Sequence, residues 1–250
     1  MAPPFDSAEI RALLLDIEGT TTPIDFVFKT LFPFASAHAE NFLRCHAQEP
    51  DIAELIEQLH EHSNAHAAEG APVWENRTNE ERLASATGYV RWLVAHDSKI
   101  TPLKTLQGRI WEEGFRSGEL KGEVYPDVAP AFARWKAQGR RIAIFSSGSV
   151  LAQKLLFSYS TAGDLSSFFA GYFDTTTGPK REAESYKKIA GSLGLATNAV
   201  LFVSDVGQEL DAASSAGMKA GHSLRPGISP LTGRRHWEIR SFDDIFPNRS

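Results

Sequence analysis

The sequence contains a single cysteine, Cys45, among 250 residues, which excludes any disulfide bond within the chain. Its apolar runs fall far short of the ~20 residues that a membrane-spanning helix needs. Residues 1–11 lack the charged-then-apolar layout of a signal peptide. These absences are typical of a protein that works in a reducing compartment away from membranes. We therefore expect a cytoplasmic protein with no membrane partner, or one that is also nuclear if the chain is eukaryotic.

Runs of basic residues are absent too, and the formal net charge at pH 7 is −5. This charge balance argues against nucleic acid and acidic membrane surfaces as partners. A negatively charged small molecule would need a local positive site, which a metal ion and a lysine supply most simply. The eight histidines are scattered without the spacing of a zinc site. The helical patterns leave no obvious apolar face uncovered, so we expect a monomer.

What the chain does contain is a repeated alternation of short apolar runs, polar turns and helical patterns. Its length allows one large or two smaller domains. Each apolar run stops abruptly, as strands buried on both faces do. The tail from Pro226 shows no clear pattern. Strands are predicted at residues 10–16, 142–145, 172–174, 200–203 and 220–223, and helices at 126–138, from 150, at 182–193 and at 208–216.

Residues 21–120 carry helical spacing without a convincing strand. Helices are predicted there from residue 25, at 36–49, from 50, at 79–96 and from 102. Pro50 begins the third of these, and one apolar stripe runs along it, formed by Ile52, Leu55, Ile56 and Leu59. Elsewhere the alternation of strands and helices favours a Rossmann-like α/β fold with a mostly parallel sheet. We therefore predict an α/β core domain of residues 1–20 and 121–250, with a helical domain of residues 21–120 inserted after the first strand.

Polar side chains follow three of the predicted strands. Asp16 and Glu18 follow the first strand, Ser146 and Ser147 follow the second, and Asp205 follows the strand at 200–203. Because the carboxyl ends of parallel strands share one edge of a sheet, we expect these side chains to meet there. Taken alone, an Asp-x-Glu after a strand also fits a solvated loop. The functional interpretation depends on the three strand ends arriving together.

The three carboxylates, Asp16, Glu18 and Asp205, suit one magnesium ion, which prefers oxygen ligands and needs only one or two carboxylates. The longer side chain of Glu18 leaves its backbone carbonyl as an alternative metal contact. Aspartate can also accept a phosphoryl group in covalent catalysis. We predict Asp16 as the nucleophile and Glu18 as the acid/base.

The remaining groups point to an anionic substrate. Ser146 and Ser147 precede a glycine and a helix start, where hydroxyl and backbone N–H groups can hold an anion. Ser149 is predicted to cap that helix. Lys180 follows a Gly-Pro pair and can neutralise phosphate charge, whereas Lys187 and Lys188 are alternatives at helical positions. Metal, amides and lysine together indicate a phosphoryl-transfer site.

These motifs resemble those of the haloacid dehalogenase superfamily. Asp16-Ile17-Glu18-Gly19-Thr20 is similar to the first motif, Asp-x-Asp-x-Thr, and Phe145-Ser146-Ser147 to the second. Lys180 is similar to the third motif and Ser204-Asp205 to the fourth. The resemblance implies that the helical domain of residues 21–120 is a cap, whose closure would exclude water around the substrate. Aromatic residues at helical spacing are more often core than ligand contacts, so we assign no cap residue to the substrate.

The glutamate variant of the first motif resembles, more closely, the enolase-phosphatases of methionine salvage. This resemblance implies hydrolysis of 2,3-diketo-5-methylthiopentyl-1-phosphate, with enolisation, to the acireductone. It also implies one Mg²⁺ per chain at Asp16, Glu18 and Asp205, with Ser146, Ser147 and Lys180 on the substrate. Glu209 is a candidate for a supporting role. Further matching segments are Leu106-Gln107-Gly108-x-x-Trp111, Tyr125-Pro126-Asp127-Val128, Ser146-Ser147-Gly148-Ser149-Val150, Gln153-Lys154-Leu155-Leu156-Phe157 and Glu184-Ser185-Tyr186-x-Lys188-Ile189.

Three other interpretations stay open at this point. The chain could be a phosphatase of the same superfamily that acts on another small ester, such as a sugar phosphate, because a fold does not fix its substrate. It could be a non-catalytic protein on the same fold, although nucleophile, second acid, lysine and metal carboxylate are all present. A dehalogenase is the weakest alternative, since halide displacement needs neither Asp205 nor magnesium.

Overall fold

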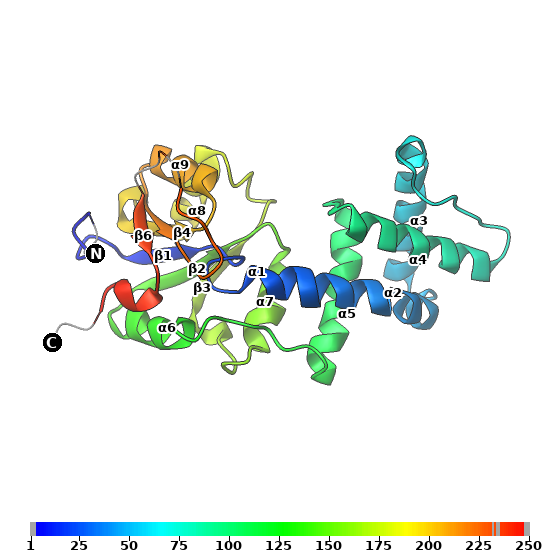
Figure 1. Ribbon diagram of the computed structural model, residues 1–250, viewed down its shortest axis with the longest axis horizontal. Helices are drawn as coiled ribbons and strands as arrows, with labels where there is room; N and C mark the ends of the chain where they lie inside the picture. The colour runs from blue at the N-terminus through cyan, green and yellow to red at the C-terminus, as the bar shows by residue number, and fades with distance from the viewer. Residues whose placement is uncertain (1–3, 232, 234–235, 248–250) are drawn as a thin grey trace. The chain divides into compact units, whose positions relative to one another are not determined.

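The computed structural model describes residues 4–231, 233 and 236–247, and it divides the chain into two compact units (Figure 1). One unit combines Met1–Phe26 with Lys121–Ser250, and the other is Val27–Leu120. The first unit contains the sheet, and the second lies within the stretch predicted as a helical insert. The function of the second unit as a cap stays a prediction.

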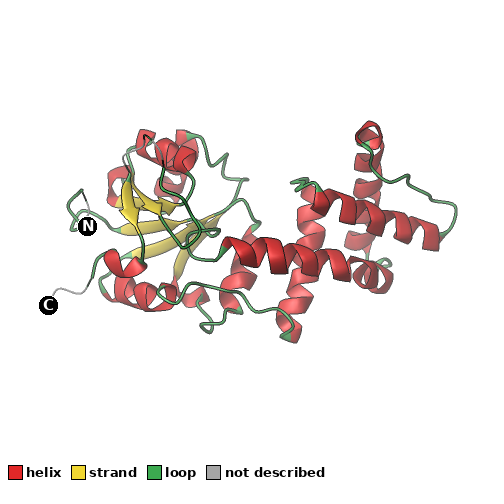
Figure 2. Cartoon of the chain, viewed as in Figure 1, coloured by secondary structure: helices red, strands yellow, loops and turns green. Residues whose placement is uncertain are grey.

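The first unit is built on a six-stranded sheet in the order β3-β2-β1-β4-β5-β6, and all its strand pairs are parallel (Figure 2). This confirms the predicted α/β fold and places β1 between β2 and β4. β6 was missed in the sequence because three residues are too few to show a strand pattern. The strands are β1 Ala12–Leu15, β2 Arg141–Phe145, β3 Phe169–Phe173, β4 Val200–Ser204, β5 Lys219–Ser223 and β6 Trp237–Ile239.

Helices cover both faces of this sheet (Figure 1). One face packs against α8 Ala183–Ser192 and α9 Gly207–Ser215, in a core that includes Tyr186 and Phe202. The helices α6 Val128–Ala137 and α7 Val150–Ser158 lie on the other side. Burial on both faces explains why β1 and β4 consist of residues that are all buried, without polar alternation.

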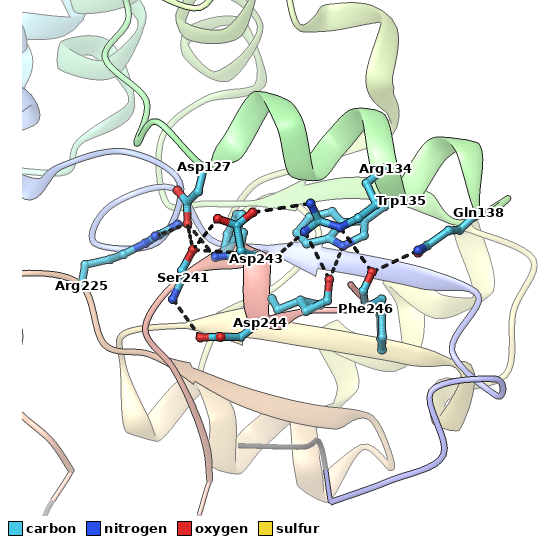
Figure 3. Close-up of polar contacts among 11 residues, drawn as sticks. Asp127, Arg134, Trp135, Gln138, Arg225, Ser241, Asp243, Asp244 and Phe246 are labelled. Carbon is cyan, nitrogen blue, oxygen red and sulfur yellow. Dashed lines mark hydrogen bonds and ion pairs between the residues drawn. The ribbon is translucent and has the colours of Figure 1, made fainter. Parts of the chain in front are cut away.

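The segment after β6 is bound to α6 by side chains that hold its backbone carbonyls (Figure 3). Arg134 donates to the carbonyl of Phe242 at 2.7 Å and to that of Phe246 at 3.2 Å. Trp135 donates from its indole nitrogen to the carbonyl of Ile245 at 2.8 Å. A buried carbonyl without a donor is costly, so these bonds stabilise the docked segment.

The second unit, Val27–Leu120, contains no strand, and the structure describes all of it. Its chain begins with a π-helical turn, Val27–Leu31. The apolar residues predicted as one stripe of α3 are buried. Across the described residues, no helix combines the length and apolarity that crossing a membrane requires. Its α-helices are α2 Phe32–His46, α3 Pro50–Ala65, α4 Asn79–Ala95 and α5 Thr101–Ser117, while α1 Ile24–Phe26 belongs to the first unit.

Candidate active site

The carboxyl end of β1 lies between those of its two neighbours. Leu15 pairs with Ile144 of β2 and with Val203 of β4, so Asp16 follows at the level of the last residue of each neighbouring strand. The Asp16 amide donates to the carbonyl of Val203 at 2.9 Å, which fixes this residue at the strand end. Asp16 is buried, and its Oδ1 accepts a hydrogen bond from its neighbour's amide at 2.8 Å.

Lys180 reaches the same point from the loop before α8. Its Nζ lies 2.8 Å from Asp16 Oδ1 and 2.7 Å from Glu209 Oε2, and its side chain is only 9% exposed. The first turns of α8 hold the backbone of Lys180 in place, because the Tyr186 hydroxyl donates to the Lys180 carbonyl at 2.6 Å. Lys187, one of the alternatives from the sequence, instead pairs with Glu184 and is exposed.

Lys180 stays protonated in this setting. Burial alone lowers the pKa of an amine, but the charges of Asp16 and Glu209 and the hydrogen bonds to them outweigh it and raise the pKa of Lys180. The geometry therefore places a permanent positive charge against the carboxylate predicted as the nucleophile. Such a charge can also neutralise a phosphate group at this position.

Ser204 is a functional candidate that the sequence did not single out beyond its place before Asp205. Its hydroxyl oxygen lies 3.0 Å from Asp16 Oδ2 and 3.0 Å from Glu209 Oε2, and it accepts from the Val206 amide at 3.1 Å. Ser204 and Lys180 together connect Asp16 to Glu209. Glu209 thus contacts both residues that touch Asp16, and its supporting role in the reaction stays a prediction.

Negative charge exceeds positive charge among these buried groups. Burial, and then the charge of Asp16, raise the pKa of Asp205 to about 7, and Glu18 adds to this effect. Burial and Asp16 likewise raise the pKa of Glu209 to about 7 in spite of Lys180. One lysine is therefore not enough to compensate the carboxylates, and an additional cation at these oxygen donors fits the site.

The carboxylates predicted to bind a metal are not arranged as a set of three ligands in the part of the chain that the structure describes. Among residues 4–231, 233 and 236–247, no group of three or more His, Cys, Asp or Glu side chains is arranged to hold a metal ion. Magnesium is compatible with this arrangement, because it keeps several waters and needs only one or two carboxylates. The backbone carbonyl of Glu18 remains the alternative contact proposed for that residue.

Ser146 and Ser147 lie at the end of β2, beside the end of β1. The Ser146 hydroxyl accepts from the Gly148 amide at 3.2 Å, so it bonds within its own loop rather than to Asp16. Ser149 begins α7, and its hydroxyl accepts from the Ala152 amide at 3.3 Å, as predicted. The structure thus places the two serines next to a helix N-terminus, which favours an anion. Their contact with substrate remains a prediction.

Comparison with known families agrees with this fold and these strand ends. The family model for haloacid dehalogenase-like hydrolases matches residues 10–217. The chain therefore belongs to this class of hydrolases.

Closer relatives define the enzyme within that class. The chain is 52% identical over 236 residues to Enolase-phosphatase E1 of Synechococcus elongatus, which covers 94% of this chain and 98% of that protein. The protein of the same name from Pseudomonas syringae pv. tomato is 47% identical over 238 residues, covering 95% and 98%. The chain belongs to the enolase-phosphatase E1 family and is a phosphoric monoester hydrolase.

Solved structures give the same result for the fold. The UTR4 protein of Saccharomyces cerevisiae is 35% identical with a TM-score of 0.76, covering 94% of this chain and 99% of that one. CbbY of Rhodobacter sphaeroides is 16% identical with a TM-score of 0.56, covering 96% and 97%, and shares the fold alone. The mostly parallel sheet with its helices is thus the haloacid dehalogenase-like architecture.

Gly19 lies where no side chain can be added without moving a carboxylate. Its φ is +64°, and a Cβ there would come within 2.5 Å of Asp205 Oδ2. We expect Gly19→Ala to lower kcat roughly 100-fold, because displaced reacting groups cost about that much. Gly139→Ala is the control: Gly139 has a φ of +75° and no atom within 4 Å of its added Cβ. The control should lose thermal stability but keep kcat, and equal kcat losses in both variants would contradict the prediction.

The raised pKa of Asp205 predicts a pH-dependent stability difference. A carboxyl whose pKa rises on folding costs nothing below its unfolded pKa, and the cost grows until pH passes the folded value of about 7. In the presence of a chelator at pH 8, the free energy of unfolding of Asp205→Asn should therefore exceed that of the wild type by roughly 2 to 4 kcal/mol. The variant should accordingly unfold at a higher temperature. The difference should be smaller at pH 5, as thermal denaturation followed by circular dichroism will show. A stability difference between the variant and the wild type that does not change with pH would contradict the raised pKa of Asp205.

Proposed function

We propose that this chain is a magnesium-dependent phosphatase that enolises and dephosphorylates 2,3-diketo-5-methylthiopentyl-1-phosphate, releasing the acireductone. The observation that carries the proposal is the buried group of Asp16, Lys180, Ser204 and Glu209, joined by contacts of 2.7 to 3.0 Å. Relatives that are about half identical carry the name Enolase-phosphatase E1. The resemblance of the first motif supplies the identity of the substrate.

Asp16 acts as the nucleophile in this proposal. One of its carboxylate oxygens attacks phosphorus, the bond from phosphorus to the ester oxygen breaks, and an aspartyl-phosphate forms. Glu18 gives a proton to the departing oxygen and later takes one from the water that hydrolyses the aspartyl-phosphate. Lys180 and Ser204 hold the Asp16 carboxylate in place before the reaction, which lowers the entropic cost of the attack.

Enolisation needs a base that removes a proton from carbon. Glu18 is our candidate for this base as well, since its carboxylate is the second acid of the first motif. Ser146 and Ser147 would bind the phosphate group together with Lys180. Glu209 would keep Lys180 oriented, as its 2.7 Å contact with the amine supports.

One magnesium ion would be held by Asp16, Glu18 and Asp205 and would oppose the charge of the phosphate oxygens. The excess of buried carboxylate over lysine, seen in the raised pKa of Asp205, supports a cation here. Binding to the folded chain alone would stabilise it. Magnesium should accordingly raise the unfolding temperature of the wild type more than that of Asp205→Asn.

The remaining properties are also proposals. We assign the unit Val27–Leu120 as the cap that selects the substrate, in keeping with the family resemblance. The chain is proposed to act as a cytoplasmic monomer on a small phosphate ester, without nucleic acid or membrane partners. The bacterial relatives give no support to a nuclear location.

Asp16→Asn tests the nucleophile. We expect a loss of phosphate release on the order of 10⁴-fold or more, because removal of a covalent nucleophile has effects of this size. Asp211→Asn, which changes an exposed carboxylate on α9, should keep the wild-type rate. Phosphate release can be measured colorimetrically, with circular dichroism to confirm folding. Persisting release by Asp16→Asn would refute the assignment, and absence of release by the wild type would favour the non-catalytic alternative.

The substrate assignment is tested by a panel of phosphate esters. The diketo phosphate should give the highest kcat/KM, and sugar phosphates should be turned over more slowly. Formation of the enol product can be followed by its ultraviolet absorbance while released phosphate is measured in the same sample. Faster turnover of a sugar phosphate would replace our substrate with the alternative of the same superfamily.

A further inference from the structure

The loop that follows Asp16 is held by donors from outside it. The carbonyls of residues 19–21 accept, in order, from the Ser223 hydroxyl at 2.9 Å, Arg225 Nε at 3.0 Å and the Tyr125 amide at 3.0 Å. None of these three donors was among the predicted site residues. Three consecutive carbonyls are thereby bound by two distant segments, one that includes the last residue of β5 and the residues just after it, and one before α6.

Arg225 is the most constrained of the three donors. It is 5% exposed, and its guanidinium lies 4.3 Å from the ring centre of Tyr125 and 4.5 Å from that of Phe242. Its Nη1 donates to Asp127 Oδ2 at 2.6 Å (Figure 3). Packing between two rings and two fixed hydrogen bonds leave this side chain little freedom.

Asp127 is itself fixed by the segment after β6. Its Oδ2 also accepts from the Ser241 hydroxyl at 3.0 Å and from the Phe242 amide at 2.6 Å (Figure 3). Burial raises the pKa of Asp127, but its bonds with Arg225, Phe242 and Ser241 outweigh burial and lower it overall. The carboxylate therefore remains charged near neutral pH, and Arg225 keeps a permanent partner.

A shift of Thr20 would also move the carboxylates of Asp16 and Asp205. Gly19 precedes Thr20 and fits closely against the Asp205 carboxylate, since an added Cβ would lie 2.5 Å from its Oδ2. The amide of Thr20 donates to the Ile17 carbonyl at 3.1 Å, in the turn directly after Asp16. The position of the Thr20 carbonyl therefore affects both Asp16 and Asp205.

We propose that Arg225 is a positioning residue for the reaction, which fixes the Thr20 carbonyl and thereby the separation of Asp16 and Asp205. This inference rests on the proposed function of those two residues. A guanidinium suits the task because its fork presents Nε to the carbonyl and Nη1 to Asp127 in fixed directions. The single amine of a lysine cannot reproduce both bonds in this geometry.

Arg225→Lys and Arg225→Gln test the proposal, assayed well below their unfolding temperatures. Both should lower kcat roughly 10- to 100-fold, as expected for misplaced reacting groups, while KM changes less than about threefold. The matched control is Arg141→Gln at the start of β2, which removes a bond to the Leu193 carbonyl and touches neither Arg225, Asp127 nor the loop of residues 19–21. The control should lower the unfolding temperature and leave kcat unchanged.

Unchanged kcat in Arg225→Lys, or an equal loss of kcat in Arg141→Gln, would overturn the proposal in favour of a purely structural role. If the Arg225 variants do not fold, Asp127→Asn decides, because it keeps Arg225 but weakens its anchor. We expect that variant to lower kcat severalfold, and an unchanged kcat would overturn the proposal. p-Nitrophenyl phosphate serves as substrate beside the diketo phosphate. If the wild type hydrolyses p-nitrophenyl phosphate but not the diketo phosphate, the substrate assignment is refuted and the proposal for Arg225 is not.

Discussion

The structure depends on the electrostatic balance at the carboxyl end of β1, where buried carboxylates share one lysine. Burying a charge without a partner is costly, so Asp16 requires Lys180, and Lys180 in turn contacts Glu209. The balance still leaves excess negative charge, and burial together with the charge of Asp16 raises the pKa of Asp205 to about 7. The same imbalance, unfavourable for the protein groups alone, would favour a divalent cation that opposes the charge of both the carboxylates and an anionic substrate.

The parallel sheet brings these groups together, and the residues around it hold them there. With β1 between β2 and β4, the residues after each strand lie at one edge, so short side chains suffice to meet. Hydrogen bonds from Arg225 and its neighbours then fix the loop after Asp16. Support for the site extends in this way to the segment after β6. The ring of Phe242 packs on Arg225, and the Phe242 amide donates to Asp127.

Much of the fold followed from local pattern. Short apolar runs predicted β1, β2 and β4 because strands covered on both faces exclude polar residues. Pro50 and the stripe after it predicted α3, and Ser149 predicted the start of α7. The short β6 escaped prediction, since its three residues gain their strand conformation from pairing with β5 rather than from their own sequence.

The sequence by itself determined which chemical groups stand at the strand ends, because a motif such as Asp16-Ile17-Glu18 is a local property of the chain. Only the tertiary structure decided which groups touch. It selected Lys180 over Lys187, made Ser204 a partner of Asp16, and brought Arg225 to the loop after Asp16. These contacts join residues far apart in the chain, and no local pattern encodes them, since they arise from strand order and from the packing of loops above the sheet.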